Sequence, residues 1–172
     1  MGNLLSWRFS WRAFLHVKPR FPLPDHWQLA EKEIQDLEGN NLFFAYFNKG
    51  TSHVALDQYS DAAIAYDQAF NLYSQWDTTK GNRPFRMMWY QTGPYWAYYY
   101  SARYADVINL ATTTLEDTIA KPELEESLLW RGRAFYMAGK TQLAIDDYRA
   151  ALLIHPKWVP AIQALQDLGV QP

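Results

Sequence analysis

Two stretches of the chain place their apolar, small and polar residues in the same order. Residues 43–74 and 125–156 align over 32 positions without a gap. The alignment pairs small with small and tyrosine with tyrosine: Gly50 with Gly132, Ala62 with Ala144, Tyr66 with Tyr148, and Ala69 with Ala151. We interpret each stretch as two helices joined by a tight turn, in which the glycine lets the second helix pass close by. Glycine inside a helix costs about 1 kcal/mol relative to alanine, so its position needs such a reason.

Further residues mark where helices begin and end. Gly139 suits the C-terminal stop between two helices, and Pro156 cannot continue its helix. Residues 158–168 predict a short closing helix with an apolar stripe of Ala161, Ile162, Ala164, Leu165 and Leu168. Asp25 can cap an earlier helix that carries Leu29, Ile34 and Leu37. Both are expected to cover the ends of a repeat array, because terminal repeats need caps.

The first part of the chain follows a different pattern. All odd positions of residues 5–18 are apolar, which is the period of a strand, although a helical interpretation through Leu4, Trp7 and Trp11 also stays open. Pro19, Pro22 and Pro24 then indicate a linker. We therefore divide the chain into an extended or strand-like head with a linker, residues 1–24, and a helical domain, residues 25–172.

The two aligned stretches resemble the tetratricopeptide repeat. The residues that carry the resemblance are Gly50, His53, Tyr59, Ala62, Tyr66 and Ala69 in one unit, and Gly132, Phe135, Gly139, Ala144, Tyr148, Ala151 and Pro156 in the other. The resemblance implies an all-α, right-handed solenoid of about three helix pairs with flanking cap helices. It covers roughly residues 43 to 168.

Residues 88–119 resemble a degenerate middle unit. Setting Tyr104 against Tyr59 places Tyr95 where the family has a small residue, and Val107 where it has alanine. We therefore expect the helices of this unit to pack farther apart than usual. Residues 73–85 are rich in turn-forming residues and predict a loop.

In this family the first helices of successive units line a concave groove that binds proteins or peptides. The resemblance places on that face Phe44, Phe47, Thr51 and Val54; Trp89, Trp96, Tyr99 and Tyr100; and Leu129, Arg133, Tyr136 and Met137. Aromatic residues and arginine are frequent anchors of protein contacts. The expected function is protein or peptide binding without catalysis. The alternative for each ring is a place in the core, and Tyr98 and Tyr104 are expected there. Phe47 and Thr51 replace residues that the chaperone-binding members need, so that class of partner is not expected.

A second resemblance concerns the order of the head, the proline-rich linker and the repeats. This order is similar to the C-terminal region of bacterial proteins that carry a papain-like cysteine-peptidase domain. It implies that residues 14–19 are the last strand of such a domain. The alternative function is therefore a structural appendage that packs in cis, either on the N-terminal segment or on a peptidase-like domain outside this sequence.

Composition and motifs give little support to an enzyme or a cofactor protein. The chain has no cysteine, which excludes thiol catalysis by its own residues. Its four histidines, at positions 16, 26, 53 and 155, do not share a metal-ligand spacing, and no phosphate-binding or nucleophile motif occurs. A net charge of −2 does not favour nucleic acid, and the apolar runs are too short for a membrane helix. We expect no cofactor and no metal.

Overall fold

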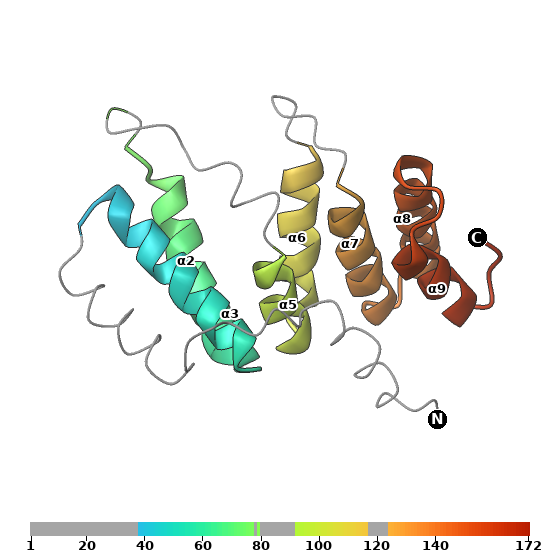
Figure 1. Cartoon of the computed structure of the whole chain (residues 1–172), viewed down its shortest axis with the longest axis horizontal. Helices are drawn as coiled ribbons and strands as arrows, with labels where there is room; N and C mark the ends of the chain where they lie inside the picture. The colour runs from blue at the N-terminus through green and yellow to red at the C-terminus, as the bar shows by residue number, and fades with distance from the viewer. Residues whose placement is uncertain (1–37, 78, 80–91, 117–123) are drawn as a thin grey trace.

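The computed structural model describes residues 38–77, 79, 92–116 and 124–172 (Figure 1). This part of the chain contains seven α-helices and no β-strand, so the all-α class is confirmed there. The helices are α2 (Asn40–Ala55), α3 (Tyr59–Ser74), α5 (Gly93–Tyr100), α6 (Tyr104–Leu115), α7 (Glu125–Met137), α8 (Thr141–Ile154) and α9 (Val159–Asp167). The head, the linker, the helix expected after Asp25, and Trp89 lie outside the described residues.

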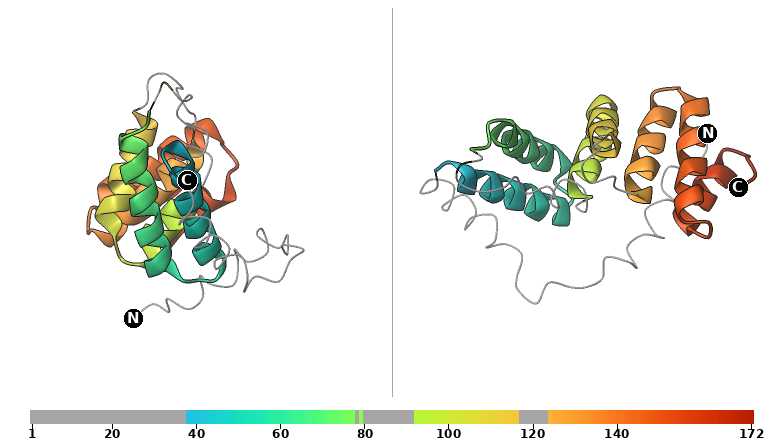
Figure 2. Two further views of the ribbon diagram at one scale, coloured as in Figure 1. Left: turned by 90° about the vertical axis from the view of Figure 1, so that its left-hand side faces the viewer. Right: turned by 90° about the horizontal axis from the view of Figure 1, so that it is seen from above.

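Six of these helices form three successive pairs, α2 with α3, α5 with α6, and α7 with α8 (Figures 1 and 2). The three pairs follow one another along the longest axis of the molecule. After the third pair, α9 packs beside α8. The helix predicted at 158–168 is therefore confirmed, with bounds at 159–167. The largest core cluster runs through the first two pairs and reaches Trp130 and Ala134 of α7.

All three pairs turn in the same way. The residue after each C-cap has a positive φ: 58° at Asp57, 61° at Ala102 and 74° at Gly139. The next backbone N–H then donates back to the helix, as from Arg103 to the Tyr98 carbonyl oxygen at 2.8 Å and from Lys140 to that of Phe135 at 2.8 Å. This is the Schellman arrangement, which supplies hydrogen bonds to the last helical carbonyls. The sequence predicted it at Gly139, but not at the two positions that lack glycine.

The repeated glycine does lie against the repeated tyrosine. A Cβ atom added to Gly50 would come within 2.8 Å of Cε1 of Tyr66, and one added to Gly132 within 2.5 Å of Cε1 of Tyr148. Both contacts are closer than a methyl group can make. The sequence-based reason for the two glycines is therefore confirmed.

The middle pair exchanges the large and the small residue. At the aligned positions, the first helix carries Tyr95, 2% exposed, and the second carries Ala111, 0% exposed, within one core cluster. The hydroxyl of Tyr95 lies 3.0 Å from Oγ of buried Ser127 on α7. Tyr95 therefore connects the middle pair to the third pair. That the middle helices stand farther apart stays a prediction.

Candidate binding site

Three of the residues that the sequence singled out lie on α5. Trp96, Tyr99 and Tyr100 are spaced i, i+3 and i+4 on α5, so they share one side of that short helix. Tyr95 and Tyr98 of the same helix are buried, at 2% and 3% exposed. This tyrosine-rich segment is therefore divided by burial, with Tyr95 and Tyr98 in the core and Trp96, Tyr99 and Tyr100 more accessible.

The rings of α5 contact rings of the neighbouring pairs on both sides. We call the set Tyr59, Trp96, Tyr99, Tyr100 and Trp130 the aromatic row. Tyr59, at the start of α3, has its ring centroid 4.8 Å from that of Tyr100. Trp130 of α7 lies 5.3 Å from Trp96 and 5.5 Å from Tyr99. The row therefore spans all three helix pairs.

The exposed fraction of the side chains differs widely within the aromatic row. Trp130 is 3% exposed and forms the floor, whereas Tyr100 is 48% exposed. Trp96 and Tyr99 are half-buried between them. On α7, Tyr136 and Met137 are 49% and 42% exposed and extend the apolar surface beyond the row. Such a surface has buried support and accessible rings, as binding anchors require.

One cation lies at the α7 end of the row. The guanidinium carbon of Arg133 sits 4.8 Å from the ring centroid of Trp130, a cation–π distance. Burial lowers the pKa of Arg133, because removal from water disfavours the charged form, while the nearby Tyr148, Tyr100 and Tyr99 raise it. Burial raises the pKa of Tyr99, so its phenol keeps its proton near neutral pH.

Two sequence-based expectations are wrong. Phe47 is 1% exposed and packs edge-on against Tyr66, with ring centroids 5.1 Å apart. Leu129 is 2% exposed and lies in a cluster with Tyr148 and with Leu165 of α9. Both side chains belong to the core rather than to an open face, because the second helix covers one and the closing helix covers the other.

The remaining candidates lie at different places. Phe44 is half-buried near the start of α2, where its ring packs edge-on against Trp76 at 5.8 Å. Thr51 is exposed, and its Oγ1 donates to the Phe47 carbonyl oxygen at 3.1 Å. Val54 is half-buried in the last turn of α2. The structure thus gathers Trp96, Tyr99, Tyr100, Arg133 and Tyr136 near one another, and it does not bring Phe44 to them.

Two members of the row were not selected from the sequence. Trp130 lies one position after Leu129, which the family alignment favoured, but it stands one helical turn from Arg133 and therefore on the same side. The sequence places Tyr59 among the residues that carry the family resemblance, and not among the groove candidates. The i, i+3 spacing of Trp130 and Arg133 was the signal that could have identified the tryptophan.

Ion pairs join the helices around the aromatic row to one another. Arg103 donates to both carboxylate oxygens of Asp67, at 2.7 and 2.9 Å, and thereby fixes the start of α6 to α3. Tyr98 donates to the same carboxylate at 2.9 Å. Arg131 of α7 makes a two-pronged contact with Asp147 of α8, at 2.9 and 2.7 Å. The helices that present the rings are therefore tied to their neighbours by directional contacts.

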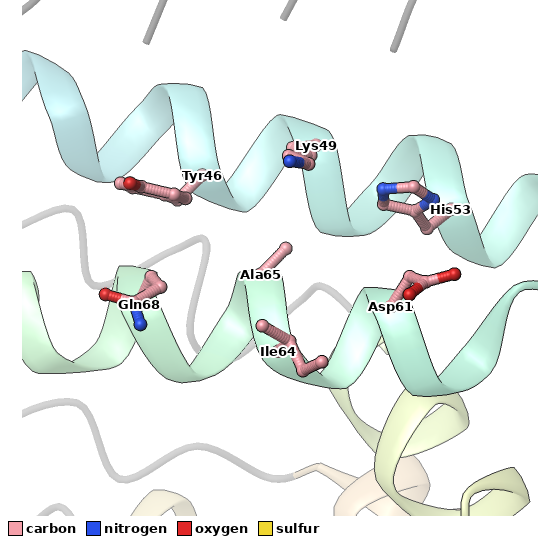
Figure 3. A pocket seen from close by; sticks show the side chains of 7 residues that line it. All are labelled: Tyr46, Lys49, His53, Asp61, Ile64, Ala65 and Gln68. Atoms are coloured by element: carbon pink, nitrogen blue, oxygen red, sulfur yellow. The ribbon is translucent and has the colours of Figure 1, made fainter. Parts of the chain in front are cut away.

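A groove lies between α2 and α3. It has a volume of about 200 Å³ and is lined by Tyr46, Lys49, His53, Asp61, Ile64, Ala65 and Gln68 (Figure 3). Ile64 is 60% exposed there, while His53 is 8% exposed with Nδ1 2.7 Å from Oε1 of Gln58. This groove belongs to the first pair alone and does not include the aromatic row.

Among the described residues, no group of histidine and acidic side chains is placed to hold a metal ion. None of the described helices is long and apolar enough to cross a membrane. No protein-family model, curated protein or solved structure matches the chain. The function must therefore be argued from the geometry of the chain itself.

Proposed function

We propose that this protein is a non-catalytic helical-repeat module of the tetratricopeptide type that binds a protein or peptide segment on its aromatic row. The observation that carries the proposal is the contact chain from Tyr59 through Tyr100 and Trp96 to Trp130, which joins three helix pairs into one partly exposed aromatic surface.

Support for the repeat part of the proposal comes from two independent features. The glycine–tyrosine contact recurs in the first and third pairs, at Gly50 and Gly132. The turn with a positive φ recurs in all three pairs. A solenoid stacks such units so that equivalent positions of successive first helices form one continuous surface. Trp96 and Arg133 are equivalent positions of this kind, as are Tyr99 and Tyr136.

Support for the binding part comes from composition and exposure. Tyrosine, tryptophan and arginine dominate the energetics of protein interfaces because they bury a large area and also donate hydrogen bonds. Here Tyr100 and Tyr136 each leave about half of their surface exposed, and the ring of Tyr100 lies 6.4 Å from that of buried Trp130.

The experiment begins with capture on the immobilised full-length chain and identification of the bound proteins. A bound segment is then synthesised and titrated against wild type and a Trp96→Ala, Tyr99→Ala variant. We expect the variant to bind at least about tenfold more weakly, as for loss of interface anchors. A second variant, Tyr100→Ala with Tyr136→Ala, removes exposed rings only and guards against unfolding of the first. If both double variants are folded and bind the segment as tightly as wild type does, the proposal is rejected.

The groove between α2 and α3 favours a second candidate function, packing in cis. Ile64 is 60% exposed in this groove, where a preceding segment or domain could cover it. The chain would then be a structural appendage of its own N-terminal segment or of a peptidase-like domain. Deletion of residues 1–22 tests the first version, since lost cover should lower the free energy of unfolding and increase binding of a hydrophobic dye. Unchanged stability and dye binding would contradict it.

A further inference from the structure

Two tyrosines of the aromatic row lie against each other although they come from different helix pairs. Tyr59 is the first residue of α3, and Tyr100 is the last residue of α5. Their ring centroids are 4.8 Å apart, and their planes are inclined by 30°. Contacting aromatic side chains have ring centroids about 4.5 to 7 Å apart, so this pair lies near the short limit. The Tyr59–Tyr100 pair therefore brings two phenol rings into direct contact between the first and second helix pairs.

Further contacts hold these two rings near each other. Helix α3 packs directly against α5. Arg103, which follows Tyr100 by three residues, donates to both carboxylate oxygens of Asp67 on α3, at 2.7 and 2.9 Å. Holding two groups in one geometry makes a reaction between them effectively unimolecular. The pair is therefore prepared for a reaction that joins its rings.

One phenol of the pair has a proton acceptor in place. Oη of Tyr59 donates to Oδ1 of Asp57 at 2.7 Å. Loss of an electron turns a phenol into a strong acid, and a carboxylate at hydrogen-bond distance is positioned to take the proton as the electron leaves. Asp57 is exposed, so the proton passes on to water. Tyr59 is therefore placed to become a neutral phenoxyl radical without passing through a radical cation.

The other phenol of the pair is accessible to an oxidant. Tyr100 is 48% exposed at the end of its helix. The chain contains no cysteine, so no thiol of the protein competes for the oxidant or quenches the radical. An oxidant in solution therefore reaches the pair directly through Tyr100.

Other tyrosine pairs of α5 are less suited to coupling. Tyr99 lies 5.4 Å from Tyr100 and 5.5 Å from Tyr104, with interplanar angles of 86° and 66°. In such pairs the edge of one ring points at the face of the other, so the ring carbons that must join do not meet. Burial also raises the pKa of Tyr99, which disfavours loss of its proton. The geometry therefore singles out the Tyr59–Tyr100 pair.

We propose that Tyr59 and Tyr100 are a site of oxidative cross-linking, which joins α3 to α5 by a dityrosine bond in the presence of hydrogen peroxide and a haem peroxidase, with Asp57 as the proton acceptor of Tyr59. Each phenol gives up one electron and one proton. The two radicals combine through one ring carbon ortho to each oxygen, and the hydrogen on each of these carbons moves to the adjacent oxygen. The two electrons and two protons reduce one hydrogen peroxide to two waters.

The dityrosine bond closes the chain between residues 59 and 100 into a loop. A covalent cross-link stabilises a protein mainly by restricting its unfolded chain. The bond also fixes the first helix pair against the second, at the point where the aromatic row passes from one to the other. Its formation does not depend on a bound partner.

The test treats the full-length protein with a haem peroxidase and hydrogen peroxide, at a protein concentration low enough to limit reaction between copies. Dityrosine fluorescence gives the rate, the intact mass reports the loss of two hydrogen atoms, and peptide mapping identifies the joined residues. We expect a monomeric product that joins Tyr59 to Tyr100 and unfolds at a higher urea concentration than the untreated protein. A product joined mainly between two copies, or through Trp96 or another tyrosine, would overturn the inference. So would a cross-linked monomer that unfolds at a lower urea concentration.

Matched variants assign the reaction to this pair. Tyr59→Phe and Tyr100→Phe keep each ring but remove a phenol, so each should lower the yield of intramolecular dityrosine at least about tenfold. Tyr136→Phe is the control, because Tyr136 is 49% exposed, much as Tyr100 is, but lies on α7. It should react as wild type does. An equal loss in this control would show that exposure alone directs the reaction, and would overturn the inference.

Asp57→Asn tests the proton acceptor. Asparagine still accepts a hydrogen bond and tolerates the φ of 58° at this position, but its amide is a far weaker base than a carboxylate. The rate of cross-linking should fall about tenfold, because a general base is lost while water replaces it in part. Asp61→Asn is the control, since Asp61 lines the groove between α2 and α3. Equal rates for wild type and a folded Asp57→Asn variant would contradict the role of Asp57.

Discussion

The ring of Tyr148 on α8 lies directly against the backbone of Gly132 on α7, so that even one added methyl group would overlap it. The same relationship joins Tyr66 to Gly50 in the first pair. In both pairs a large side chain on the second helix uses the space that glycine leaves on the first. The contact lies within the first and third pairs, which contribute Tyr59 and Trp130 to the aromatic row.

Replacement of Gly132 by alanine should therefore destabilise the protein. The added Cβ would lie 2.5 Å from Cε1 of Tyr148 and 3.2 Å from the Ala144 carbonyl oxygen. We expect the free energy of unfolding to fall by about 1 to 3 kcal/mol, the usual cost of overpacking, although alanine is the better helix former. Urea denaturation measures the change. The control is the same substitution in a Tyr148→Leu background, where it should cost less; an equal cost in both backgrounds would contradict the account.

Replacement of Ala102 by glycine should have the opposite effect. Ala102 has φ of 61°, a left-handed conformation that costs a residue with a Cβ about 1 to 2 kcal/mol. Glycine removes this cost, but the unfolded chain with glycine has more conformational entropy to lose on folding, which costs about 0.5 to 1 kcal/mol. We therefore expect the free energy of unfolding to rise by roughly 0.5 to 1 kcal/mol. Ala138→Gly is the matched control, because Ala138 has φ of −84° and should lose stability. Denaturation midpoints that move in the same direction for both variants would count against this explanation.

The pair of Arg131 and Asp147 should be more sensitive to substitution than the exposed carboxylates. Its side chains are only 20% and 8% exposed, and removal of one partner leaves the other charge buried. Asp147→Asn should lower the free energy of unfolding by about 3 kcal/mol, near the lower end of measured values for broken buried pairs. The neighbouring Asp146 is exposed and accepts from the side-chain amide of Gln142 at 2.9 Å. Asp146→Asn is the control and should change stability by less than about 0.5 kcal/mol.

Stability should decrease in alkaline solution because of the buried tyrosines. Burial raises the pKa of Tyr66 from 10.0 to about 12. Between these values the unfolded chain has lost the phenol proton while the folded chain keeps it, so rising pH favours unfolding. Tyr66 should contribute a loss on the order of 2 kcal/mol across this interval, at about 1.4 kcal/mol per pH unit. Below pH 10 both states keep the phenol proton of Tyr66, so this loss of stability is absent there.

The comparison that isolates Tyr66 is a Tyr66→Phe variant followed by denaturation from pH 9 to 12. Its free energy of unfolding should fall less steeply with pH than that of wild type. Burial raises the pKa of Tyr95, Tyr98, Tyr99 and Tyr148 as well, so the variant should retain part of the slope. Identical slopes for the two proteins would show that Tyr66 titrates alike in both states.

The sequence predicted those features of the fold that depend on small residues at a fixed spacing. Gly50 and Tyr66 could be paired from the alignment because each has an identical counterpart in the third pair. The turns at Asp57 and Ala102 could not, since a left-handed position without glycine has no local signature. The alignment sets Tyr95 against Gly50 and Ala111 against Tyr66, but it did not indicate that the Tyr95 hydroxyl lies 3.0 Å from Oγ of Ser127 on α7.

The candidate site was predicted in part. Trp96, Tyr99, Tyr100, Arg133 and Tyr136 lie near one another, as their positions on the first helices indicated. Burial of Leu129 depends on α9, which closes over the third pair, and burial of Phe47 depends on the rings of the second helix. Such contacts between elements cannot be obtained from the family positions of one helix alone.

The most direct test of the account is site-specific photo-crosslinking at the aromatic row. p-Benzoylphenylalanine replaces Tyr100 in one sample of the full-length chain and Leu153 in another, because both positions are exposed but only Tyr100 belongs to the row. Irradiation with the captured partner should give a crosslinked product from position 100 and none from position 153. Crosslinks from position 153 with none from position 100 would contradict the assignment of the binding face.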